Sequence, residues 1–173
     1  MQNMTKATAI ITGGALAIAL CTFPATVGAG AGDEAKIRAL EEQFVAAFNA
    51  KDVDAIMKVY VPGNSLIVFD VVPPRQYVGA QAYRDDWVKF FNMFKGPVKF
   101  EISDLAIMAD RTLAYSHSIQ HLTGAHANGS SIDLTVRVTD AYRKIKGQWL
   151  IEHEHVSVPV DLDTGKPDLA SKP

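Results

Sequence analysis

Histidines are the residues of this sequence best suited to acid–base chemistry, because the imidazole pKa of about 6.5 lies close to neutrality. The chain has five of them, all in its C-terminal half: His117, His121, His126, His153 and His155. Successive side chains of a β-strand alternate between its two faces, so residues two apart share a face. In strands, His153, His155 and Ser157 therefore share one face, and Tyr115, His117 and His121 share another.

Arg137 stands between two valines in a third strand-like stretch, and we expect its side chain to be buried. A buried guanidinium requires an anion or several acceptors. Two partners fit, namely the Asp70 carboxylate or a substrate carboxylate held bidentately. If the three strands are neighbours, Arg137 and the histidines converge on the concave face of the sheet. This holds only without a β-bulge, because one extra residue would swap the faces.

Hydrophobic periodicity predicts three helices, at residues 33–50, at 52–60 and after Gly79. The third helix carries an aromatic stripe that includes Tyr83 and Trp87. Strand patterns cover residues 65–70, 98–108, 113–123, 132–145 and 149–158. Three N-terminal helices packed on a mostly antiparallel sheet make an α+β domain. So few helices can cover the sheet only if it is strongly curved, which leaves a conical pocket between the two layers.

Several stretches resemble the nuclear-transport-factor-2-like superfamily, which includes ketosteroid isomerase, SnoaL-type cyclases and the association domain of calcium/calmodulin-dependent kinase. They are residues 48–60, 67–87, 136–149 and 152–157. The ending from Trp149 through His153, His155 and Ser157 is similar to that of the kinase association domain and of many small SnoaL-like proteins. The resemblance covers residues 35–159 and implies a cystatin-like roll.

This resemblance offers Asp70 as a general base, because it aligns with the base of ketosteroid isomerase. The oxyanion tyrosine of that enzyme lies on its first helix, where this chain has Phe44 and Phe48, so the steroid isomerase mechanism is not assigned. Asp70 has a second interpretation, as a cap of the turn before Pro73. The superfamily's pockets are mostly metal-free, so we expect no metal at the imidazoles, although they suit zinc or copper, and no cofactor.

The candidate site combines these residues around one cavity. Its predicted catalytic residues are Asp70, His117 and His155. Its predicted ligand-binding residues are Tyr60, Trp87, Tyr115, Arg137, His153 and Ser157. Replacement of His155 is expected to weaken ligand binding more than stability.

Two functions from different classes follow. The first is an enzyme that moves a proton on a small, partly apolar molecule, by isomerisation, dehydration or cyclisation. The second is a module that binds a ligand or assembles without turnover, as the kinase association domain does, and the missing oxyanion tyrosine favours it. Fold alone does not decide between them.

The N-terminus predicts an exported protein. Residues 1–31 are expected to be a cleaved signal peptide, because a short apolar stretch follows Lys6 and small residues follow Pro24. The stretch of about fourteen residues is too short for a membrane anchor, which needs about 20. Residues 32–160 form the SnoaL-like domain, and residues 161–173 a loose tail. The lone Cys21 leaves no cysteine after cleavage.

The composition limits the classes of partner that we expect for this protein. A net charge of −2 disfavours nucleic acid. We expect a periplasmic or extracellular protein with a small-molecule ligand. We also expect a homodimer through the outer face of the sheet, where Val136, Val138, Leu150 and Val156 would form an apolar surface.

Overall fold

The computed structural model describes residues 29–170. Residues 1–28 of the predicted leader and the last three residues of the tail lie outside this range, while residues 29–31 of that leader lie within it. Three helical segments come first: α1 (Ala29–Ala50), α2 (Val53–Ile56) with the adjoining 3₁₀ turn η1 (Met57–Val59), and α3 (Ala80–Asn92). The strands are β1 (Ile67–Phe69), β2 (Tyr77–Val78), β3 (Phe94–Ala109), β4 (Leu113–His126), β5 (Ser131–Ile145) and β6 (Gln148–Ser157). Among residues 29–170, no helix has the length and apolarity needed to span a membrane.

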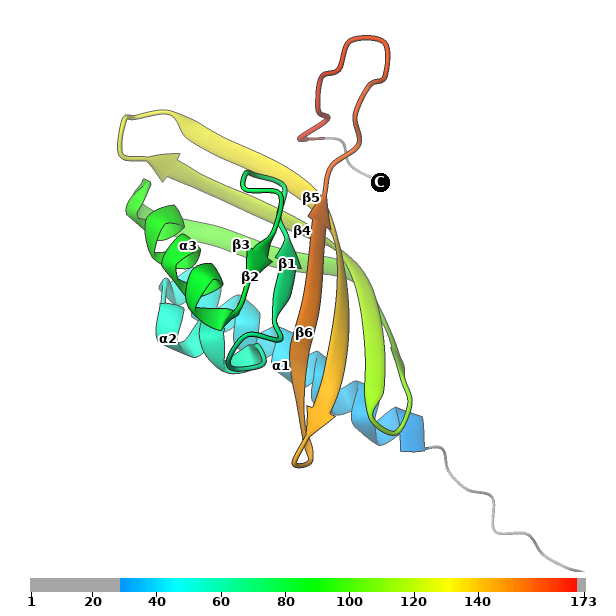
Figure 1. Ribbon diagram of the computed structural model, residues 1–173. Helices are drawn as coiled ribbons and strands as arrows, with labels where there is room; N and C mark the ends of the chain where they lie inside the picture. The colour runs from blue at the N-terminus through cyan, green and yellow to red at the C-terminus, as the bar shows by residue number, and fades with distance from the viewer. Residues whose placement is uncertain (1–28, 171–173) are drawn as a thin grey trace, which may run out of the picture.

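One mixed sheet contains all six strands in the order β2-β1-β6-β5-β4-β3. The β1–β6 pair is parallel and the other pairs are antiparallel. The register of β3 against β4 shifts between Phe94 and Val98 and again between Ser103 and Ala106. Because such bulges bend a strand, the long strands curl around the helices (Figure 1). The predicted α+β roll with a strongly curved, open sheet is confirmed.

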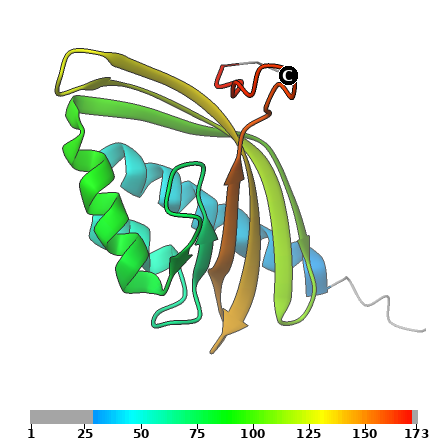
Figure 2. The same cartoon turned by 45° about the horizontal axis from the view of Figure 1, so that its top comes forward.

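Both long helices lie on the concave side of this sheet, and α3 closes the wider end (Figure 2). An aromatic cluster joins the two layers. Phe48 of α1 stacks on Phe100 of β3, with ring centroids 4.1 Å apart, and contacts Trp87 of α3 edge-on at 5.4 Å. Aromatic contacts of this kind add about 0.5–1.5 kcal/mol beyond burial. The aromatic stripe predicted for α3 therefore packs in the core, with Trp87 between both layers.

Gly79 sets the start of α3 and hence the position of Trp87. Its φ of 88° is in the region that favours glycine, and a Cβ there would lie 3.2 Å from the Asn64 side-chain oxygen. The amide of Ala80 then donates to the Gly63 carbonyl at 2.8 Å. This glycine thus allows the chain to turn from β2 directly into the helix.

A β-bulge in β6 decides which side chains face the helices. Ala141 of β5 is opposite His153, but the next residue, Tyr142, is opposite Ile151, so Glu152 is one extra residue on β6. Before the bulge, Ile151 is buried. Beyond it, the buried residue is Glu154. His153 and His155 therefore face the convex side.

In the neighbouring strands β4 and β5, the odd-numbered residues face the convex side. Their buried residues are the even-numbered ones: Ser116, Ser118, Gln120, Val136, Val138, Asp140 and Tyr142. The prediction that Val136 and Val138 make an apolar outer face is therefore wrong, because both valines point toward the helices.

Residues 161–170 return to the end of the sheet (Figure 1). The Thr135 amide donates to the Leu169 carbonyl at 2.7 Å, and Val160 forms a bridge with Pro167. The side chains of this segment are exposed. Backbone hydrogen bonds attach it to the domain.

Candidate functional site

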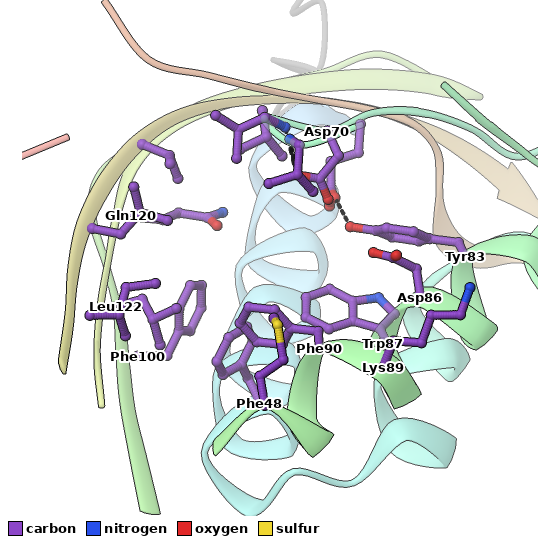
Figure 3. A pocket seen from close by; sticks show the side chains of 18 of the residues that line it. Phe48, Asp70, Tyr83, Asp86, Trp87, Lys89, Phe90, Phe100, Gln120 and Leu122 are labelled. Atoms are coloured by element: carbon purple, nitrogen blue, oxygen red, sulfur yellow. Dashed lines mark hydrogen bonds between the residues drawn. The ribbon is translucent and has the colours of Figure 1, made fainter. Parts of the chain in front are cut away.

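A cavity of about 400 Å³ lies between α3 and the concave face of the sheet (Figure 3). This volume is within the range of small-molecule pockets, roughly 300–1,000 Å³. Most of its wall is apolar, and the aromatic part consists of Phe44, Phe48, Trp87, Phe90 and Phe100. The polar side chains in the wall are Asp70, Tyr83, Asp86, Lys89, Gln120 and Glu154. An apolar cavity with a few polar groups is typical of a site for a partly apolar molecule.

Glu154 is the most deeply buried acid of the cavity wall, with 5% of its surface exposed. The Tyr83 hydroxyl donates to one carboxylate oxygen at 2.5 Å, and the Tyr60 hydroxyl donates to the other at 2.7 Å. Burial raises the pKa of Glu154 from 4.5 to about 7, although the two tyrosine hydrogen bonds oppose the shift. Glu154 can therefore hold or release a proton near neutral pH.

Asp70 lies in the same wall, directly after β1. Its Oδ1 accepts hydrogen bonds from the amides of Val71 at 2.5 Å and Val72 at 3.4 Å. Partial burial raises the pKa of Asp70, and these two amides oppose the rise. Asp70 and the Tyr83 hydroxyl lie at the same end of the cavity (Figure 3). Both interpretations of Asp70 therefore fit the structure, since it caps the turn and lines the cavity.

Asp86 and Lys89 extend the polar part of the wall along α3. Asp86 accepts a hydrogen bond from the Tyr77 hydroxyl at 2.7 Å, and Lys89 is exposed. Lys89 is the only cationic side chain among the described residues that line the cavity, against the three acids Asp70, Asp86 and Glu154. This balance disfavours an anionic ligand.

A second group of buried acids lies beneath the cavity. Asp140 is 2% exposed and directly opposite Glu154 in the β5–β6 register. Tyr142 donates to Glu41 of α1 at 2.7 Å and contacts the Ser116 hydroxyl at 2.7 Å. None of the ion pairs formed within residues 29–170 involves Asp140, Glu154 or Glu41. Burial raises the pKa of Glu41 to about 6 and that of Asp140 well above its usual range.

The structure brings together only part of the predicted site. Asp70 and Trp87 line the cavity. Tyr60 lies behind the wall, where its hydroxyl bonds to Glu154. The remaining six residues share the convex face: Tyr115, His117, Arg137, His153, His155 and Ser157.

These six residues are neighbours, as predicted, but on the opposite side of the sheet. His117 is opposite Thr139, which is opposite His155, and Arg137 is opposite Ser157. The prediction that this group lines the cavity is wrong for two reasons. The bulge at Glu152 inverts β6, and the even-numbered residues of β4 and β5 are the ones that face the helices. Arg137 is exposed rather than buried, and no ion pair within residues 29–170 joins it to Asp70.

Within the described residues, no three histidine, cysteine or acidic side chains are placed to hold a metal ion. His153 contacts the Ile67 carbonyl through Nδ1 at 2.9 Å, and Phe69 packs edge-on against both His153 and His155. The imidazoles of β6 are therefore engaged with β1.

Glu154, Asp140 and Gln120 were missed by the sequence reasoning. A signal was present in β5, where Val136, Val138 and Tyr142 share their face with Asp140. The most apolar face of a strand is normally the buried one. In β5, this apolar face also carries the buried acid Asp140.

A profile of the SnoaL-like domain matches residues 37–161, which is more than half of the chain. The chain belongs to the SnoaL-like family. Members of this family are thus expected to share the roll and its cavity, while their chemistry differs. The comparison with curated proteins finds no match.

Solved structures show the same fold. An NTF2-like protein of unknown function from Pseudomonas putida is 31% identical, with a TM-score of 0.74 over 82% of this chain and 97% of that one. A ketosteroid isomerase-like protein from Erwinia carotovora is 20% identical, with a TM-score of 0.60 over 71% and 93%. A protein from Xanthomonas campestris, provisionally named a calcium/calmodulin dependent protein kinase II association domain, is 21% identical, with a TM-score of 0.60 over 70% and 84%. The resemblance to this superfamily is confirmed.

Proposed function

We propose that this SnoaL-like protein binds a small, partly apolar molecule in the cavity and catalyses a proton transfer on it, with Asp70 as base and Glu154 as acid. The observation that carries the proposal is the presence of two acids with raised pKa values in one apolar wall. Paired titratable groups in different environments are typical of acid–base sites.

The two acids differ in a way that assigns their roles. Asp70 accepts hydrogen bonds from two backbone amides, and these bonds favour its carboxylate form. It is therefore suited to take a proton from a carbon or hydroxyl. Glu154 is more deeply buried, and its pKa of about 7 leaves it partly protonated at neutral pH. It is suited to donate a proton to a carbonyl or to a leaving hydroxyl. Isomerisation and dehydration both need such a pair.

Tyr83 and Tyr60 supply the hydroxyls that the first helix lacks. Both donate to Glu154 in the structure. When Glu154 gives up its proton, these two hydrogen bonds stabilise the carboxylate that remains. The tyrosines thus allow Glu154 to cycle between its two states inside an apolar wall.

The non-catalytic alternative, ligand binding or assembly, has support in the name of the Xanthomonas protein. Assembly by itself leaves the paired acids without a role. The name of the Erwinia protein is in line with proton transfer.

Exchange of carbon-bound hydrogen tests the proposal without knowledge of the natural substrate. The probe is 2-tetralone, a bicyclic ketone with acidic hydrogens beside its carbonyl, incubated in deuterated buffer and followed by NMR. We expect the wild type to accelerate exchange, Asp70→Asn to abolish the acceleration and Glu154→Gln to reduce it by roughly 10²- to 10⁴-fold. Asp85→Asn, which replaces an exposed acid of α3, is the matched control. Binding of 2-tetralone without any acceleration would favour the non-catalytic alternative.

We further propose export, because of the leader pattern in residues 1–31. N-terminal sequencing of material from outside the cytoplasm should give a start near Gly30 or Gly32. Intact residues before Ala25 would contradict this.

We also propose a homodimer through the convex face of the sheet. Phe69 and Tyr115 are large side chains on this face that are 37% and 45% exposed. Sedimentation at micromolar concentration should give a dimer that Tyr115→Glu weakens. A monomeric wild type would contradict the proposal.

A further inference from the structure

Gln120 of β4 places a polar amide in the cavity wall with little hydrogen bonding from the protein. The residue is only 8% exposed, and its amide reaches into the cavity from the wall opposite Tyr83 (Figure 3). Its side chain forms one hydrogen bond within the described residues, a long one from Nε2 to the Ser118 hydroxyl at 3.5 Å. An amide offers two donor hydrogens and an acceptor oxygen, so most of its capacity is unused.

The apolar surroundings of Gln120 make its unused hydrogen-bonding capacity unfavourable for the stability of the fold. In the sheet register it lies between Ile102 and Val136, and Leu122 and Leu134 follow on the same face. A buried polar group without partners reduces stability. A leucine would fill the position without that cost, so the amide has no evident structural purpose.

We propose that Gln120 is a specificity-determining residue that hydrogen-bonds a carbonyl or hydroxyl of a neutral, ring-containing ligand. This inference rests on the proposed function, because it concerns the same cavity. The aromatic wall formed by Phe44, Phe48, Trp87, Phe90 and Phe100 suits a flat apolar body. Three acids against one lysine in the wall disfavour an anionic head group on electrostatic grounds. The polar group of the ligand then meets Gln120, while Asp70 and Glu154 act from another wall.

A pair of shape-matched probes isolates this hydrogen bond. 2-Acetylnaphthalene and 2-ethylnaphthalene have similar size, but only the ketone can accept a hydrogen bond. Their dissociation constants can be measured by quenching of tryptophan fluorescence, since Trp87 lines the cavity. The ratio of the two constants is compared between the wild type, Gln120→Leu and Gln120→Met. Gln148→Leu, at an exposed glutamine, is the control.

We expect the preference for the ketone to fall by roughly three- to tenfold in both Gln120 variants, as for loss of one hydrogen bond, and to stay unchanged in Gln148→Leu. We also expect both Gln120 variants to melt at or above the wild-type temperature, which a structural glutamine would not allow. An unchanged ratio with both probes bound would overturn the role of Gln120 and leave the proposed function standing. If neither probe binds the wild type, the proposed function fails and this inference with it.

Discussion

Asp140 of β5 and Glu154 of β6 lie directly opposite one another, both on the concave face and both buried. Directly opposed residues of an antiparallel pair have Cβ atoms about 4.5–5.5 Å apart. Two carboxyls at this separation cannot both ionise without mutual repulsion. The Glu154 carboxylate raises the pKa of Asp140, in addition to the larger effect of burial. The predictions below begin from this pair.

The first prediction concerns stability and pH. The pKa values of Glu154, Asp140 and Glu41 are raised above their ordinary values, so the unfolded chain loses these protons at lower pH than the folded one. Their contribution is complete below pH 4 and is lost as the pH rises through the folded values. For Glu154 alone, a shift from 4.5 to about 7 is of the order of 3 kcal/mol. Urea unfolding should therefore show lower stability at pH 8 than at pH 5.

The half-buried His121 contributes in the same direction, because Asp133 and Glu101 raise its pKa. Its hydrogen bonds lie at the surface, where solvent screens them, so its share is small. His121→Gln should leave most of the slope intact. Equal stability at pH 5 and pH 8 in the wild type would contradict the first prediction.

The second prediction concerns the effect of the buried Asp140 carboxyl on stability. Asp140→Asn removes an ionisable group that has no ion-pair partner within residues 29–170 and whose Oδ1 has no hydrogen bond there. We expect it to stabilise the fold at pH 8 by about 1–3 kcal/mol and to change little at pH 5. Denaturant melts at both pH values measure this. Asp110→Asn, in the exposed β3–β4 turn, is the control and should have no effect at either pH.

The third prediction concerns the bulge. Deletion of Glu152 removes the extra residue and turns the histidines of β6 toward the helices and Glu154 toward solvent. Because a one-residue slip moves a whole set of side chains to the wrong face, we expect the protein not to fold, as judged by circular dichroism. Glu152→Gln keeps the residue and loses only the exposed ion pair with Arg143 at 2.7 Å. That variant should lose no more than about 1 kcal/mol, and a stable deletion variant would show that the bulge is dispensable.

The fourth prediction concerns the convex face. Since His155 and Arg137 are exposed there, His155→Ala and Arg137→Ala should leave the binding of 2-ethylnaphthalene unchanged. This reverses the expectation drawn from the sequence for His155. Glu154→Gln and Phe48→Ala serve as comparisons inside the core, and the latter should cost roughly 3–5 kcal/mol. Weaker probe binding by His155→Ala in a folded protein would restore the histidine to the site.

Local pattern was sufficient to predict most of the fold. The stripe of Tyr83, Trp87 and Phe91 has the helical period, and the apolar alternation of β5 has the strand period, so the order of the elements follows from short-range periodicity. The same patterns, with the HxHxS ending of β6, carry the family resemblance. The two-residue strand β2 was not predicted, because Tyr77 and Val78 become a strand only by pairing with β1.

The site depended on tertiary structure. Alternation tells which residues share a face, and it grouped His117, Arg137 and His155 correctly. It does not tell which face the helices cover, and the bulge at Glu152 has no local signature because it exists only relative to the register of β5. Alternation without a bulge predicted the imidazoles inside and the acids outside. Packing made the opposite arrangement, since the face that carries Val136 and Val138 must be buried and takes Asp140 with it.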